Sequence, residues 1–134
     1  MYFSVKVICL LFCGVLLSIY SVCAQESADD NFNQRHLDVS VSLLSTDISE
    51  AYRVADSLVK VARKDEHKVK AYMLLAKLYE NEGDLNKSLK NAMLADTIST
   101  AMTNATWQAI TSGYLSTTFH RLGLLKLATH YLKK

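Results

Sequence analysis

The chain contains no proline and only four glycines among its 134 residues. Proline and glycine are the strongest turn formers, and folds built from many short strands need frequent turns. Their scarcity argues against a turn-rich all-β fold. Half of the residues are hydrophobic, which is enough for the core of one small domain.

The chain also lacks a strong charge of either sign. Its 15 basic and 13 acidic residues leave a formal net charge of +2. A strongly basic surface is the electrostatic signature of nucleic-acid binding. We therefore expect no nucleic acid to bind through this chain.

All three cysteines, Cys9, Cys13 and Cys23, lie within the first 24 residues. This segment has one lysine, an apolar run over residues 7–17, and a Val-Cys-Ala end that fits the small-residue cleavage rule of secretory signals. We predict that residues 1–24 are a signal peptide cleaved after Ala24. The exported chain would then contain no cysteine, which suits the bacterial periplasm or cell envelope.

Two other interpretations of this segment stay open. Residues 7–24 are nearly as long as the roughly 20 residues that span a bilayer, so an uncleaved signal anchor is one alternative. Cys23 suggests a lipoprotein site, but Val22 and Tyr20 fit that site poorly. We expect contact with a membrane only if the segment is uncleaved.

Residues 69–95 predict two helices joined by a short turn. Gly83 ends the first helix because glycine adopts a left-handed backbone without steric cost, and Asp84 can cap the second helix. Neither helix can bury its apolar face alone, so we expect neighbouring hairpins to stack on this one. The apolar and small residues that recur at steps of three and four are Val69, Tyr72, Leu75, Ala76 and Tyr79, then Leu85, Ser88, Leu89, Ala92 and Ala95.

The predicted hairpin recurs 40 residues later in the sequence. Both copies keep an aromatic residue four positions before the glycine. A period of this size is typical of helical repeat arrays. The aligned pairs are Leu75 and Leu115, Tyr79 and Phe119, Gly83 and Gly123, Leu85 and Leu125, and Ser88 and Ala128.

On these residues the chain resembles the tetratricopeptide repeat family. Ser88 and Ala92 depart from the family's pattern, and Ser112 stands where a large residue belongs. The period of 40 exceeds the family's value of about 34, so we expect longer helices or a longer link near residues 97–106. The residues that match the structural motif are Tyr72, Leu75, Ala76, Tyr79, Gly83 and Ala95 in one copy, and Leu115, Ser116, Phe119, Gly123, Ala128 and Leu132 in the next.

A weaker copy precedes these two. Asp47 and Glu50 form a capping box before a helical stripe that runs to Ala62. Its partner helix should lie near residues 33–44. The apolar residues alternate there, and this alternation taken by itself favours a strand. We prefer a helix because a lone strand would have no partner. The predicted architecture is all-α: a flexible lead-in at 25–32, then stacked antiparallel helical hairpins over about 33–64, 66–102 and 105–134.

Catalytic and metal-binding patterns are missing from the sequence. His36, His67, His120 and His130 are scattered without metal-ligand spacing. No glycine-rich phosphate loop, nucleophile elbow or HExxH motif occurs. We expect no enzymatic activity, no cofactor and no metal. The charge run at 63–70 is interpreted as a solvated turn between helices, with an anion-binding patch as the alternative.

The resemblance implies a binding surface. In the tetratricopeptide family the first helix of each repeat lines a concave groove that takes extended or helical peptides. Members that clamp a terminal carboxylate use lysine and asparagine there, and this chain has no matching asparagine. An ordinary polar solvent face is the alternative. The inner-face positions carry Lys70, Met73, Lys77 and Glu80, then Ile110, Gly113, Thr117 and His120.

The last predicted helix is rich in leucine, whereas terminal repeats normally end in a polar capping helix. We expect either a partner on this face, such as a second copy, or a truncated array. The sequence thus predicts an exported interaction module that binds a protein or peptide on its concave face. The alternative is a truncated sensory ectodomain of a membrane-bound bacterial transcriptional regulator, because the exported repeat region of helix-turn-helix sensor-regulators is similar to this chain.

Overall fold

The computed structural model describes residues 21, 24, 26–36 and 48–134. The chain divides into two compact units, residues 1–34 and 35–134. Throughout the described ranges the regular structure is helical and no strand is present, so the predicted all-α class is confirmed. Two predicted features lie outside the described residues: the signal segment predicted at 1–24, apart from residues 21 and 24, and segment 37–47 with the predicted capping aspartate.

Residues 26–36 are helical. A flexible lead-in is predicted over residues 25–32, and the structure instead has a helix from residue 26 onward. The segment contains neither glycine nor proline to interrupt a helix.

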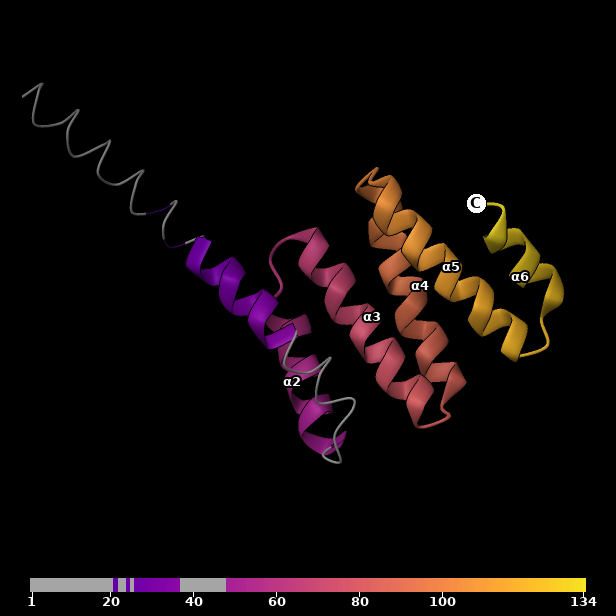
Figure 1. Cartoon of the computed structure of the whole chain (residues 1–134), viewed down its shortest axis with the longest axis horizontal. Coiled ribbons are helices and arrows are strands. Elements are labelled where there is room, and N and C mark those ends of the chain that lie inside the picture. The colour runs from indigo at the N-terminus through magenta and orange to yellow at the C-terminus, as the bar shows by residue number, and fades with distance from the viewer. Residues whose placement is uncertain (1–20, 22–23, 25, 37–47) are drawn as a thin grey trace, which may run out of the picture. The chain divides into compact units, whose positions relative to one another are not determined.

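The second unit contains five helices along residues 48–134 (Figure 1). Each helix packs on the one that follows it in the sequence. The last four begin at residues 65, 85, 105 and 125, which are 20 residues apart, so two helices make up the predicted period of 40. Their bounds are α2 Ile48–Val61, α3 Asp65–Asn81, α4 Leu85–Ala101, α5 Ala105–Arg121 and α6 Leu125–Leu132.

The turns after α3, α4 and α5 share one conformation. Gly83, Thr103 and Gly123 occupy the same position in them, with φ of 83°, 54° and 74°. The residue after each is the N-cap of the next helix, where Asp84 accepts a bond from the Lys87 backbone N–H at 3.0 Å. The predicted helix break at Gly83 and the cap by Asp84 are therefore confirmed. Because these turns are equally short, the period of 40 comes from the length of the helices and not from a long link.

Helix α3 is buried on more sides than the sequence pattern predicts. The predicted stripe through Val69, Leu75 and Ala76 is buried, but Leu74 and Leu78, which lie outside that stripe, are buried too. The reason is that α3 packs against both α2 and α4. A helix held on two sides needs apolar residues around most of its circumference.

The core shared by the four helices α3 to α6 combines small residues with a few large ones. Ala76, Ala92 and Ala128 let the helix backbones approach closely, while Leu115 and Phe119 of α5 fill the space between them. The Phe119 ring stacks on Tyr131 with the centroids 5.4 Å apart. This cluster joins both copies of the repeat around α5.

Candidate interaction surfaces

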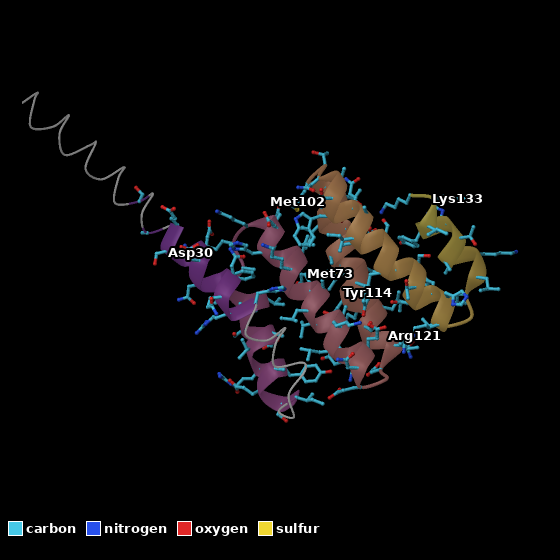
Figure 2. The ribbon with its side chains drawn as sticks, in the orientation of Figure 1. Asp30, Met73, Met102, Tyr114, Arg121 and Lys133 are labelled. Carbon is cyan, nitrogen blue, oxygen red and sulfur yellow. The ribbon has the colours of Figure 1, made fainter. Side chains whose placement is uncertain are left out.

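Side chains of α3 reach α5 at both ends of one face, which we call the α3–α5 face. Near the start of α3 the Lys70 Nζ lies 5.9 Å from the centre of the Trp107 ring, a cation–π contact. Near its end Glu80 accepts a hydrogen bond from the Tyr114 hydroxyl at 2.9 Å. Figure 2 labels Met73 on α3 and Tyr114 and Arg121 on α5, which follow one another along this face.

Glu80 is the centre of a polar cluster on this face. Its carboxylate also pairs with Arg121 of α5 and with Lys77, whose Nζ is 3.1 Å away. Its side chain is only 13% exposed. Burial alone would raise the pKa of Glu80, but the hydrogen bonds from Lys77 and Tyr114 and the nearby charges of Lys77 and Arg121 outweigh it and lower that pKa.

Tyr114 extends this cluster to a third helix. Its hydroxyl lies 3.0 Å from the Ser88 Oγ of α4 while it donates to Glu80 of α3. Burial raises the pKa of Tyr114 to about 12, the Ser88 bond opposes this shift, and the Glu80 carboxylate adds to it. One hydroxyl of α5 thus holds both helices of the preceding hairpin.

The predicted groove residues differ in how available they are for a ligand. Lys70 is mostly buried and pairs with Glu66 at 3.0 Å, and Glu80 is occupied by its cluster. Met73 is half-buried, whereas Lys77, Gly113, Thr117 and His120 are exposed. Ile110 keeps 45% of its surface exposed, which makes it a large apolar group open to a partner.

The predicted repeat-motif residues lie mostly in the core. Tyr72 and Tyr79 are only half-buried, and the Tyr79 ring contacts Tyr52 of α2 with the centroids 5.1 Å apart. Lys87 Nζ lies 5.2 Å from the same ring. The motif residues that are buried are Leu75, Ala76, Ala95, Leu115, Phe119 and Ala128, whereas Gly83, Gly123 and Leu132 are exposed.

A second polar cluster surrounds Asp96 of α4, and the sequence patterns do not reveal it. Asp96 is 6% exposed, and its Oδ1 accepts from Thr111 at 3.0 Å and from Ser112 at 3.4 Å. Its Oδ2 accepts from the Lys134 Nζ at 2.6 Å. The only signal in the sequence is the abundance of serine and threonine between residues 97 and 118, where Ser99, Thr111 and Ser112 are buried.

A hollow of about 440 Å³ lies along α4, away from the predicted groove positions. Met93 and Leu94 line it and are 45% and 41% exposed. Sequence reasoning missed this feature because these two residues lie outside the predicted apolar stripe of the helix. The other lining residues are Asn86, Leu89, Lys90 and Thr97.

The histidines do not gather with other ligands. Among the described residues no group of three or more histidine, cysteine, aspartate or glutamate side chains could hold a metal ion. His67 is buried in α3, and His36 is half-buried. Burial lowers the pKa of His36, and the charge of Lys70 lowers it further.

The described helices include none that is both long enough and apolar enough to cross a membrane. Comparison of the chain with protein-family models, with curated proteins and with solved structures finds no match.

Proposed function

We propose that this chain is an exported, non-enzymatic interaction module, similar to tetratricopeptide repeats, that binds a protein or peptide along the α3–α5 face. The observation that carries the proposal is that some side chains of that face are paired within the fold and others stay exposed. Its one carboxylate, Glu80, is neutralised within the fold, whereas Ile110 and Lys77 stay exposed. The Ile110 side chain therefore remains open to a ligand, together with the exposed ammonium group of Lys77, whose partner in the fold is Glu80.

These groups favour a particular kind of peptide. Ile110 and the half-buried Met73 offer an apolar contact, and a few well-packed, fully desolvated side chains supply most of the binding energy at an interface. The Lys77 ammonium group has three donors, so beside its bond to Glu80 it can donate to a peptide carboxylate or carbonyl. The Thr117 hydroxyl donates to the Gly113 carbonyl and can accept a bond from a peptide N–H. We expect an apolar anchor residue in the peptide with an acceptor or acidic residue beside it.

Selection from a displayed library of random peptides against the purified chain tests this proposal. The expected result is enrichment of peptides that combine an apolar residue with an acidic one. Binding of a selected peptide should fall by at least about tenfold in Ile110→Glu, because a charge would replace the apolar contact.

The matched control is Met93→Glu in the α4 hollow. Met93 and Ile110 are both 45% exposed, so both changes place a carboxylate at an equally open helical site. Selected peptides should bind Met93→Glu as they bind the unchanged chain. Failure to enrich any peptide, or greater loss of binding in Met93→Glu than in Ile110→Glu, would overturn the proposal.

A further inference from the structure

The face formed by the outer sides of α5 and α6 leaves its leucines uncovered. Leu125 is 60% exposed and Leu132 is 75% exposed. We call this surface the end face and define it by Ser116, His120, Leu125, Thr129 and Leu132. Of these residues only His120 is also a predicted groove residue.

The end face is equivalent to a face of the preceding hairpin that is covered by another helix. Because the repeat period is 40, Leu132 is equivalent to Ala92 and Ser116 is equivalent to Ala76. Ala92 and Ala76 are fully buried, and both lie in the cluster with Leu115 and Phe119 of α5. The equivalent face of the preceding hairpin is therefore covered by a helix, namely α5.

The hydrogen-bonding group at the edge of this face differs between the two copies. Glu80 accepts hydrogen bonds from Tyr114 and Arg121 of the covering helix α5. Its equivalent 40 residues later is the exposed His120, a potential donor. A helix seated on the end face would need an acceptor where α5 carries a donor.

The charges around the end face also favour an acidic partner. No acidic residue follows Asp96 in the sequence. Arg121 and Lys134 are paired with Glu80 and Asp96, whereas Lys126 and Lys133 have no ion pair within the described part of the chain. A second copy docked through the same face would bring like charges together, which disfavours that occupant.

We propose that the end face binds an acidic amphipathic helix of a protein partner. This helix would take the position relative to α5 and α6 that α5 takes relative to α3 and α4. Its acidic side chain would face His120, and small residues would face Leu132, because leucine is larger than the equivalent Ala92. Burial of the exposed Leu125 and Leu132 would drive association, and the charges would select the partner.

Two fluorescent helical peptides copied from residues 104–122 test this proposal against the full chain. Both carry Leu115→Ala to make room for Leu132, and a side-chain cross-link keeps them equally helical. The acidic probe also carries Arg121→Glu, while the other probe keeps the arginine. Fluorescence anisotropy should show the acidic probe binding at least about tenfold more tightly.

Variants of the chain locate the binding. Leu132→Glu should abolish binding of the acidic probe, and the high exposure of Leu132 means that the fold survives the change. Leu127→Glu is the matched control, since Leu127 is 43% exposed and lies about 140° around α6 from Leu132. Ile110→Glu, which should weaken peptide binding at the α3–α5 face at least about tenfold, should leave the acidic probe bound.

Several results would overturn the proposal. Equal binding of both probes would show that charge does not select the partner. Absence of binding by either probe would show that the end face is not a site for such a helix. Equal loss in Leu127→Glu and Leu132→Glu would show that the end face is not the contact. Reversible dimers in sedimentation that Leu132→Glu abolishes would instead assign the face to a second copy.

Discussion

Glu80 illustrates how the role of one side chain depends on its neighbours. Its inner-face position predicts contact with a ligand. The structure instead gives it three partners within the chain, Lys77, Tyr114 and Arg121. Because hydrogen bonds to charged groups stabilise more than neutral ones, Glu80 should contribute to stability by joining α3 to α5.

We expect Glu80→Gln to lower the free energy of unfolding at pH 7 by about 1–2 kcal/mol. The pKa of Glu80 lies below its ordinary value of 4.5 in the folded chain, so its charge stabilises the fold above that pH. This stabilisation is lost as the pH falls through the folded-state pKa. Urea unfolding of both proteins from pH 7 to pH 3 should show the difference between them shrinking below about pH 4.5.

Asp56→Asn is the control for this experiment. Asp56 pairs with Lys60 at 2.5 Å, but both side chains are more than half exposed. An exposed pair contributes roughly 0–1 kcal/mol, so this change should have a small effect at every pH. A pH-independent difference between Glu80→Gln and the unchanged chain would contradict the assignment of an ionised, bonded Glu80.

At the scale of single residues, the sequence predicts those features that depend only on neighbouring residues in the chain. The turn glycine at position 83 and the cap at Asp84 depend on neighbouring residues, and both are confirmed. The cluster around Asp96 depends on Thr111 and Ser112, which are 15 and 16 residues away. No periodic pattern connects these residues, so sequence reasoning does not find them.

At the scale of the elements, the turn between α4 and α5 lacks the residue that its conformation favours. Thr103 takes φ of 54° where Gly83 and Gly123 stand in the other two turns. A β-branched residue in this left-handed region is strained, at a cost of about 1–2 kcal/mol. The missing glycine also explains why the sequence leaves open a longer link near residues 97–106.

Replacement of Thr103 by glycine should therefore stabilise the chain. The expected gain is about 0.5–1 kcal/mol, because relief of strain is partly offset by the greater freedom of glycine in the unfolded chain. Guanidinium unfolding followed by circular dichroism would measure it. The reverse change, Gly123→Thr, should destabilise, and a loss of stability in Thr103→Gly would contradict the shared turn conformation.

Helix α3 shows another feature that the apolar pattern of the sequence does not predict. The sequence identifies one apolar stripe, and the structure buries Leu74 and Leu78 outside it. Periodicity gives one apolar stripe, but it does not show that α3 packs against both α2 and α4 and so buries residues beyond that stripe. The type of element is thus easier to predict than the number of its buried sides.

At the scale of the whole molecule, Lys134 ties residue 134 to the middle of the helical stack. It bonds to the buried Asp96 at 2.6 Å and to the Thr100 Oγ1 at 3.1 Å. Its Nζ also lies 5.5 Å from the Tyr131 ring. These contacts connect α4 with the segment that follows α6.

We expect Lys134→Met to lower the free energy of unfolding by about 1–3 kcal/mol, because it leaves the buried Asp96 carboxylate without its cation. The matched control is Lys133→Met at the neighbouring exposed position, which should stay within about 0.5 kcal/mol of the unchanged chain. Thermal unfolding of the three proteins at neutral pH would measure both effects. Equal midpoints for Lys134→Met and Lys133→Met would show that the contact with Asp96 is unimportant for stability.

The central claim is that the α3–α5 face is the binding surface, and one measurement tests it most directly. Backbone NMR spectra of the isotope-labelled chain would be recorded with and without a peptide selected on it. The account predicts that the largest shift changes fall on Met73, Lys77, Ile110 and Thr117. Changes confined to Leu89, Met93 and Leu94 in the α4 hollow would contradict it.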